Sequence, residues 1–562
     1  MTVINKLTLA SVLTFGFLLS MLGFFVILAA LFTGVIGLAL GIVLIVLINI
    51  VVFFISPIIM DLSLRFLYRA REMKLDEFVK TYGAPAEVIM RIKEEKKYVN
   101  VKNVYVIDDN TPAAFTYGSL PSEARLALSR GLIDMLSKDE LEIVLAHEMG
   151  HIANLDFMIM TLAQTFVQIF YMIYSSILKS AMRPRGNSRE RKDGSAVFLL
   201  LIAVLAYAFY LISRYVVLYL SRVREYYADE FAVRFTKKPK ALAMSLIKIA
   251  YGLGIAPSEQ WAKFKGVEAL CIAAPAPFAV KPSNDPDEFV KYTDFDFKSP
   301  WATLVELDST HPLIGRRVKR IYELGMEMGL IKSLPVDLKN AEEERVKPDY
   351  LRLGLYLLSM PIFVLSVYIV SFAIGLVGVL IFGAPGISLS LALLIGAVGL
   401  SIVASGLLGI MRYLDSRQYT LENLLMDETA SPVSGKFVEI EGKAIGRGEA
   451  GYVFSTDLYV NTKENVFLLV KTGFAIPVLN FIVGIIRIFG MGQLLGQNVK
   501  IKGWFFRGNG YWIDGDHIEF SGGTKWDNYM KLGSILGGIL YILIGGLVML
   551  FALFSPFLIF ML

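Results

Sequence analysis

The feature that most constrains this chain is an almost continuous apolar run from Leu7 to Ile59, interrupted near Thr33 and Gly34. A membrane-spanning helix needs about 20 apolar residues, so the run is too long for one span and suits two. A cleavable signal peptide is not expected, because its apolar core would be much shorter than this run. The sequence therefore predicts two membrane helices at the start of the chain.

Further apolar stretches predict five more spans. They lie at about Phe157–Ser180, Ala196–Leu220, Leu353–Phe382, Ile387–Met411 and Leu532–Leu562. Hydrophobic residues make up 55% of the 562 residues and charged residues 19%, which exceeds the apolar share of an ordinary soluble domain. The chain is therefore predicted to be a multi-pass α-helical membrane protein with seven spans.

These spans divide the chain into alternating membrane and soluble segments. The membrane segments are 1–61 with two helices, 158–220 with a helical hairpin, 351–413 with helices five and six, and 532–562 with the last helix. The soluble segments are 62–157, 221–350 and 414–531. The third soluble segment alternates polar and apolar residues and is rich in glycine, which predicts a small β-barrel or sandwich.

Short patterns indicate the local structure of the first soluble segment. A helical pattern covers Leu75 to Glu95, and Val101–Ile107 and Ala113–Tyr117 read as short strands. Ser137 is expected to cap the next helix, with Glu140 completing a capping box. Within the β segment, Phe474–Phe489 is apolar but carries Pro477, Asn480 and Arg487, so we interpret it as an interfacial or partner-facing segment and not as a full span.

The helix after Ser137 carries a motif with chemical meaning, His147-Glu148-Met149-Gly150-His151. Residues four apart share one face of an α-helix, so both imidazoles can bind one ion. Glu148 lies beside that face, where its carboxylate can act as general base on a zinc-bound water. Two imidazoles with a carboxylate suit four-coordinate Zn²⁺ that keeps one position open.

A chance match to this short pattern is the alternative interpretation. The chain has only four histidines in 562 residues, and two of them fall in this spacing. The preceding residues 141–146 are mostly apolar and form a helix that is at least half buried, where a histidine pair needs a partner. We therefore expect one Zn²⁺ ion per chain.

The third ligand is expected to be a carboxylate, because Phe157 occupies the position where a longer zinc motif has its third histidine. The hairpin 158–220 returns the chain to the same membrane face, which brings Glu225 to the depth of His151. Asp229 is four residues further on and shares its helical face, so it can orient a ligand. A solvated charge at the end of a span is the alternative for Glu225.

Several ordered motifs together resemble the HtpX-like branch of the M48 family of integral-membrane zinc metallopeptidases. The resemblance covers roughly residues 1 to 330. It is carried by His147–His151 with Asn154 and Asp156, by residues 221–229, by Thr310-His311-Pro312 with Arg317, and by Ala114-Phe115 with Gly118 and Arg130-Gly131-Leu132.

This resemblance implies a mixed α+β zincin domain of the gluzincin type, made of 62–157 and 221–350. It implies hydrolysis of peptide bonds in membrane or misfolded proteins, a role in protein quality control. The edge strand formed by Ala113, Ala114, Phe115 and Thr116 would pair with substrate, and His311, Arg317 and Asn154 would support the site or the transition state. Pro312 is expected to open a helix that contains Arg317.

Charges indicate sidedness and partners. The turns between spans one and two and between spans five and six are uncharged, whereas basic residues flank the opposite ends, which places the peptidase and β domains in the cytoplasm. The basic charges of loop 183–193 contradict this assignment.

The overall charge and the cysteine count bear on partners and disulfides. A net charge of +5 is small for this length and argues against a nucleic-acid partner, and the single cysteine, Cys271, excludes an internal disulfide. The lipid bilayer, protein substrates and a membrane-protein partner for 414–531 are the expected contacts.

Two rival functions remain open. A prenyl-protein endoprotease, from the other main branch of the same superfamily, would need an enclosed chamber among the spans. A catalytically silent scaffold that binds partners through its β domain would have no need of Glu148 as a general base.

Overall fold

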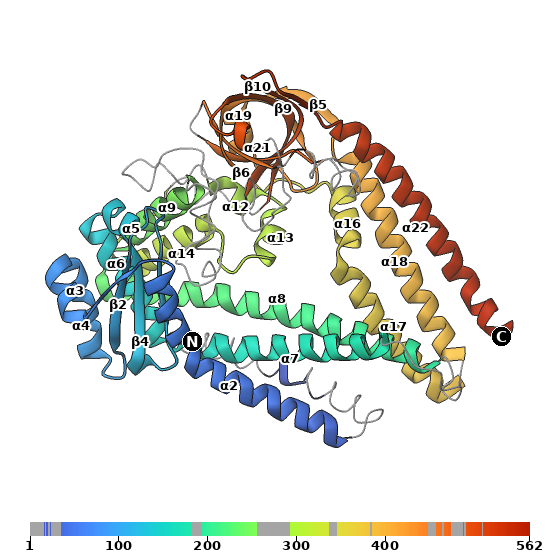
Figure 1. Ribbon diagram of the computed structural model, residues 1–562, viewed down its shortest axis with the longest axis horizontal. Coiled ribbons are helices and arrows are strands. Elements are labelled where there is room, and N and C mark those ends of the chain that lie inside the picture. Colours follow the sequence, from blue (N-terminus) through green and yellow to red (C-terminus); the bar gives the residue numbers. More distant parts are fainter. Residues whose placement is uncertain are drawn as a thin grey trace.

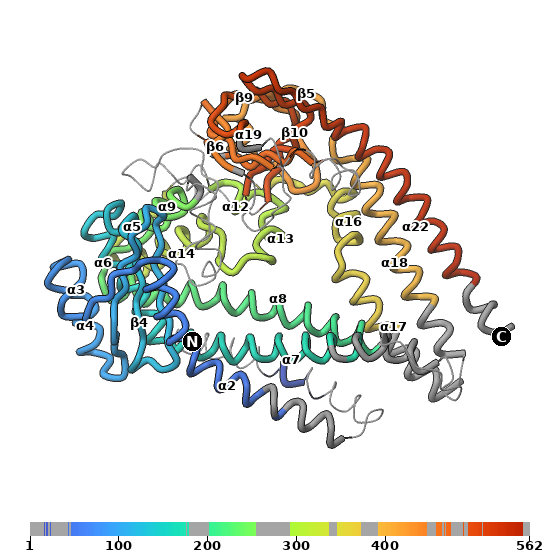
Figure 2. Tube along the Cα trace, viewed as in Figure 1, coloured from blue at the N-terminus to red at the C-terminus, as the bar shows by residue number. Residues whose placement is uncertain are grey.

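The computed structural model describes most of the chain, and Figure 2 draws most of these residues in colour. Apart from a few isolated positions, the described residues are 35–182, 194–255, 293–335, 345–382, 385–447, 457–463, 466–473, 491–508 and 510–561. The first predicted span, the basic loop 183–193 and nearly all of Phe474–Phe489 lie outside the described residues.

Five helices in the described part of the chain are long and apolar enough to cross a membrane. They are α2 (Val35–Phe66), α7 (Asp156–Met182), α8 (Gly194–Thr236), α18 (Pro385–Met411) and α22 (Met530–Met561). α16 (Tyr350–Ser359) and α17 (Pro361–Phe382) together are also long and apolar enough, although they are bent by 64° at Met360. Counting this bent pair as one span gives six. The seven-span total stays a prediction.

Large apolar side chains cover the outer faces of these helices. Ile59 on α2 is 57% exposed and Leu547 on α22 is 67% exposed. Such surfaces are costly in water and favourable against lipid tails. Figure 1 shows α7 beside α8 and α18 beside α22; the mixed α/β region lies at the left end of the first pair, and the barrel described below lies at the upper end of the second.

The mixed region contains a four-stranded sheet in the order β1-β2-β4-β3. Its strands are β1 (Arg71–Met73), β2 (Val101–Ile107), β3 (Ala114–Tyr117) and β4 (Ala124–Ser129). Among the described strands, β3 pairs only with β4, antiparallel, so it lies at the edge of this sheet. The predicted strands are therefore confirmed, and the proposed substrate strand is an edge strand.

Helices pack around this sheet to form one apolar core. They are α3 (Leu75–Tyr82), α4 (Ala84–Glu95), α5 (Arg130–Met135), α6 (Lys138–Ala153), α9 (Pro239–Ile255) and α14 (Ile314–Glu327). Val104 of β2, Val144 of α6 and Ile247 of α9 are all fully buried in this core. Because α9 and α14 follow the hairpin in sequence, the core joins the two soluble segments on either side of it.

Two helix boundaries differ from the sequence predictions. The single helix expected over Leu75 to Glu95 is divided, because Gly83 adopts a φ of +66° between α3 and α4. The helix expected to open at Pro312 begins at Ile314 instead, with Leu313 as its N-cap. Glu306 accepts a hydrogen bond from the Leu313 N–H at 3.0 Å, which holds this residue in an extended conformation before the helix.

The third soluble segment forms a closed β-barrel, one of the two architectures that its sequence left open. Its strands are β6 (Lys436–Arg447), β7 (Leu458–Thr462), β8 (Phe467–Lys471), β9 (Asn498–Arg507) and β10 (Tyr511–Phe520). β6 pairs with β7, β7 with β8, β8 with β10 in parallel, β10 with β9, and β9 with β6, which closes the ring. Side chains such as Val460, Leu468 and Ile513 fill its interior.

Short elements surround the barrel and join it to the membrane helices. They are β5 (Asp415–Tyr419), α19 (Leu421–Leu425), α21 (Met491–Leu494) and β11 (Lys525–Asp527). Arg412, directly after α18, pairs with Asp514 of β10 at 3.0 Å and lies 4.2 Å from the centre of the Phe506 ring. The barrel is therefore anchored where α18 ends.

A buried polar cluster ties the edge strand to α2, and its loss is expected to destabilise the protein. Asp61 of α2 accepts hydrogen bonds from the Tyr117 hydroxyl at 2.7 Å and from Arg125 at 3.2 Å. Asp61→Ala would leave Arg125 buried without its carboxylate, which typically costs about 3 to 5 kcal/mol. Asp108→Ala is the matched control, because its ion pair with Arg130 is exposed and worth about 1 kcal/mol or less.

Thermal unfolding of the detergent-solubilised protein measures both variants. The Asp61→Ala variant should unfold several degrees below the Asp108→Ala variant. Equal unfolding temperatures would show that the cluster does not hold α2 against the sheet.

Candidate metal site

The helix that carries the histidines is fixed at its start and buried along its length. Ser137 caps α6: its hydroxyl accepts from the Glu140 N–H at 3.4 Å, and the Glu140 carboxylate accepts from the Ser137 N–H at 2.8 Å. The predicted capping box is therefore confirmed. Lys248 of α9 also contacts Glu140 at 2.9 Å, which joins the helix start to the core.

The two imidazoles of this helix converge on one point. Nε2 of His147 lies 3.1 Å from Nε2 of His151. Each Nδ1 faces a carboxylate, since His147 Nδ1 lies 3.0 Å from Asp229 and His151 Nδ1 lies 2.6 Å from Asp156. A carboxylate at Nδ1 fixes the proton there and leaves Nε2 with a lone pair for a metal.

Glu225 of α8 completes this group. Its carboxylate oxygens lie 3.7 Å from His147 Nε2 and 3.6 Å from His151 Nε2. Donor atoms of the three residues all fall within 4.8 Å of one another, a spacing that suits a single metal ion. α8 runs unbroken from Gly194 to Thr236, as the sequence indicated, so Asp229 follows one turn later on the same face.

The close approach of α8 to α6 depends on Gly150. A Cβ at this position would lie 3.3 Å from the Ala228 Cα and 3.1 Å from the Phe231 ring. A larger residue would push the helices apart and move Glu225 away from the histidines.

The surroundings of Glu148 give the best indication of whether the site suits a metal. Its side chain is fully buried, and in the described structure neither carboxylate oxygen accepts a hydrogen bond. A buried carboxylate without a donor is costly unless something else occupies the space beside it. Burial also raises the pKa of Glu148 to about 7, which suits a group that accepts and releases a proton near neutral pH. The donor set and the unpaired carboxylate therefore fit a catalytic zinc site with an adjacent base.

The other residues named from the sequence lie at different distances from this group. Arg317 of α14 is fully buried and pairs with Asp229 at 2.8 Å and with Glu225 at 3.1 Å. His311 Nδ1 lies 3.5 Å from Glu225. Asn154 forms the C-cap of α6, and no described contact joins its side chain to the metal group. Arg317 and His311 therefore lie beside the carboxylate of Glu225, whereas Asn154 ends the helix.

The proposed substrate strand lies against the histidine helix. The Thr116 hydroxyl of β3 is 3.5 Å from the backbone carbonyl of Glu148. Ala113, Ala114 and Phe115 are at most 1% exposed, and Thr116 is 7% exposed. The strand is therefore next to the site but buried in this conformation.

Sequence reasoning did not assign a role to Asp156 or Arg224. Asp156 bonds His151, and Arg224 pairs with the other oxygen of Asp156 at 2.9 Å. Leu155 has a φ of +60°, which separates α6 from α7 and turns Asp156, the first residue of α7, back toward His151. Such a turn was not predicted from the local residue pattern.

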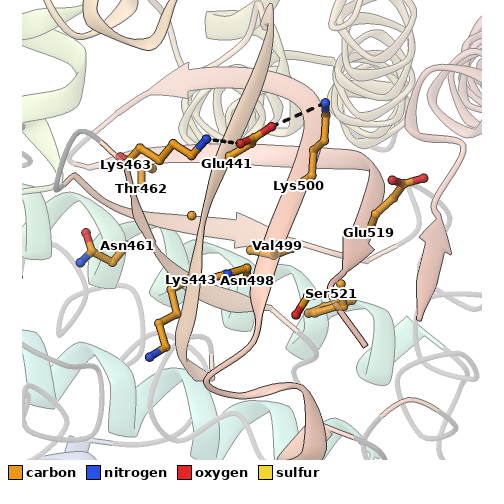
Figure 3. A pocket seen from close by; sticks show the side chains of 12 residues that line it. Glu441, Lys443, Asn461, Thr462, Lys463, Asn498, Val499, Lys500, Glu519 and Ser521 are labelled. Carbon is orange, nitrogen blue, oxygen red and sulfur yellow. Dashed lines mark hydrogen bonds and ion pairs between the residues drawn. The ribbon is translucent and has the colours of Figure 1, made fainter. Parts of the chain in front are cut away.

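A separate groove of about 650 Å³ lies on the barrel (Figure 3). Its cationic side chains are partly neutralised, because Glu441 pairs with Lys463 and with Lys500 at 3.6 Å. All its lining residues belong to the barrel, whereas the metal group lies on α6 and α8. The groove is therefore distinct from the metal site.

A family model and several known proteins match the part of the chain that contains this site. The model of peptidase family M48 matches residues 86–324. The protease HtpX homolog of Pyrococcus abyssi is 33% identical over 228 residues, covering 41% of this chain and 69% of that protein. The protease HtpX homolog of Thermococcus sibiricus is 28% identical over 265 residues, covering 47% of this chain and 80% of that protein.

A solved structure also aligns with this chain, the crystal structure of S. mikatae Ste24p. The alignment has a TM-score of 0.31 and 18% identity, and covers 57% of this chain and 66% of that one. This likeness is too low for a conclusion about fold or activity. The family match and the HtpX relatives are sufficient by themselves, and this chain is an HtpX-like member of peptidase family M48, a metalloprotease family of the membrane.

Proposed function

We propose that this chain is a zinc endopeptidase of the cell membrane that hydrolyses membrane or misfolded proteins. The convergence of His147, His151 and Glu225 beside the unpaired carboxylate of Glu148 is the observation that carries this proposal. The three residues would hold one Zn²⁺ ion. Zinc would supply a Lewis acid at this point, which acidifies water and polarises a carbonyl.

The side chains around the site have separate tasks in this mechanism. Glu148 removes a proton from the attacking water and passes it to the leaving amine. Asp229 and Asp156 orient the two histidines through their Nδ1 atoms. Arg317 holds Glu225 in place and offsets its charge. His311, beside the same carboxylate, is a candidate donor to the oxyanion.

An extended substrate would pair with the free edge of β3. Main-chain pairing tolerates many side chains, which suits a protease that acts on damaged proteins. The contact between Thr116 and the carbonyl of Glu148 supports this placement, because it puts the strand beside the general base. Since β3 is buried, binding in this mode requires that its outer edge become accessible.

The proposed function predicts that proteolysis depends on a removable metal. Treatment of the purified full-length chain with a chelator should abolish cleavage of casein, and one equivalent of Zn²⁺ should restore it. Persistent cleavage in metal-free protein would refute the proposal. A matched sample of the Glu148→Gln variant shows whether any residual cleavage comes from a contaminating protease.

We further propose that the peptidase region and the barrel face the cytoplasm. Single cysteines in a Cys271→Ala background test this arrangement with an impermeant thiol reagent on intact cells. Lys463→Cys, at a barrel position whose side chain is 71% exposed, should stay unlabelled until the cells are opened. Ser188→Cys, in the basic loop, should react in intact cells. The reverse pattern would show that the loop is the cytoplasmic side.

A further inference from the structure

One arginine of the barrel reaches into the peptidase region. Arg507 is the last residue of β9 and is 6% exposed. Its guanidinium lies 3.8 Å from the centre of the Phe295 ring and 5.0 Å from that of Tyr511. Phe295 belongs to α12 (Asp294–Lys298), which Figure 1 shows next to the barrel. The barrel is therefore joined to α12 by a stacked, buried cation.

A second contact supports the same junction. Lys298, at the end of α12, pairs with Glu428 at 3.1 Å, shortly before the first strand of the barrel ring. Val433, which also precedes that strand, packs with Phe295 and Trp301 in one apolar cluster. The junction thus combines apolar packing with two cations.

α12 in turn holds the start of α14. Asp296, beside Phe295, accepts a hydrogen bond from the Gly315 N–H at 2.8 Å, and its backbone carbonyl accepts one from Arg316 at 3.0 Å. Burial raises the pKa of Asp296 to about 6, and the nearby charge of Arg507 acts against this rise. A charged carboxylate at a helix N-terminus interacts favourably with the helix dipole. Arg507 favours the charged form of Asp296, and this form stabilises the start of α14.

α14 carries the arginine that contacts the metal ligands. Arg317 lies two positions after Gly315 along α14. Arg317 donates to both oxygens of Asp229 at 2.9 and 2.8 Å and pairs with Glu225 at 3.1 Å. A shift at the start of this helix would move the guanidinium relative to the two carboxylates.

We propose that Arg507 is a positioning residue for the metal site, acting through α12, Asp296 and α14 on Arg317. This inference rests on the proposed function, since it needs zinc at His147, His151 and Glu225. In this view, a residue of the barrel contributes to the geometry of the metal site.

The test compares Arg507→Met with Arg417→Met in the full-length, detergent-solubilised protein. Arg507→Met keeps the apolar stem and loses the charge, and Arg417 lies on β5 beside the barrel, with a side chain that is 80% exposed. Zinc affinity of the metal-free protein, kcat and KM are measured for each. Arg507→Met should weaken zinc binding about 10-fold, as losses of outer partners do, and should lower kcat with KM within about two-fold. Arg417→Met should match the wild type.

A double variant separates positioning from general loss of stability. If Arg507 acts through Arg317, adding Arg507→Met to Arg317→Met should cause little further loss of zinc affinity. Fully additive losses, or unchanged zinc affinity in folded Arg507→Met, would overturn the inference. If Arg507→Met does not fold, Asp296→Asn decides in its place, since it keeps the shape and loses the charge. Its zinc affinity should also fall, and an unchanged affinity would contradict the inference.

The wild type separates this inference from the proposed function. Zinc binding and casein cleavage by the wild type with no effect of Arg507→Met would refute only the role of Arg507. Absence of zinc binding or cleavage in the wild type would refute the proposed function itself.

Discussion

Glu148→Gln is expected to abolish nearly all proteolysis while the protein keeps its fold and its zinc. Glutamine has the same shape but cannot accept the proton of the attacking water. Loss of a general base typically costs about 10²- to 10⁴-fold in rate. Zinc should remain because Glu148 is not one of the three ligands that converge. Casein cleavage and zinc content of the same sample measure the two quantities together.

The variant is expected to fold at least as well as the wild type. Neither carboxylate oxygen of Glu148 has a hydrogen-bond donor among the described residues, so a neutral amide removes a buried charge. Wild-type cleavage would refute the role of Glu148. Loss of zinc together with activity would show that Glu148 is a ligand instead of the base.

Glu225→Ala should reduce zinc binding more than any change outside the ligand group. The variant removes one of three protein ligands, so zinc affinity should fall by more than the about 10- to 100-fold that loss of an outer partner costs. Arg317 would keep its two contacts with Asp229, which supports folding of the variant. Proteolysis should be lost with the metal.

Two neighbours on the same helix are matched controls for Glu225→Ala. Glu230 pairs with Arg234 at 2.7 Å, one turn along α8, so Glu230→Ala should leave zinc content near normal. The zinc affinity of Asp229→Ala should lie between those of Glu225→Ala and Glu230→Ala. We expect it to be about 10- to 100-fold weaker than that of the wild type, because Asp229 orients His147. Normal zinc in Glu225→Ala with zinc loss in Glu230→Ala would show that the ligand was assigned to the wrong face of the helix.

Much of the site was predictable because its signals are local or follow helical geometry. The capping box of Ser137 and Glu140 fixes where α6 begins, and the four-residue spacing then puts both histidines on one face. The long helix α8 preserves its phase from the membrane to Asp229, so counting turns was enough to bring Glu225 and Asp229 to one side.

Other parts depend on contacts that no local pattern encodes. Arg317 reaches Asp229 across 88 positions of sequence, and its ion pair was not predicted from helical periodicity. Asp156 bonds His151 only because Leu155 turns the chain between α6 and α7. The stacking of Arg507 on Phe295 joins the β segment to the second peptidase segment, and no residue pattern in either segment indicates this contact.

The barrel, too, was predictable from the sequence only in part. Alternation of residues was sufficient to predict strands in 414–531, and periodicity alone could not decide between a barrel and a sandwich. The parallel pairing of β8 with β10 closes the ring, although β9 lies between these strands in the sequence. The order of strands in space is set by long-range pairing, which alternation along the chain does not encode.

X-ray absorption of the zinc-loaded Glu148→Gln protein tests the central claim most directly, because it reports the ligand atoms themselves. We expect two imidazole nitrogens at about 2.0 to 2.1 Å, oxygen at about 2.0 to 2.2 Å and no sulfur. The signal of one imidazole should disappear in His151→Ala. A sulfur neighbour at about 2.3 Å, or two imidazoles that persist in His151→Ala, would contradict a zinc site built from His147, His151 and Glu225.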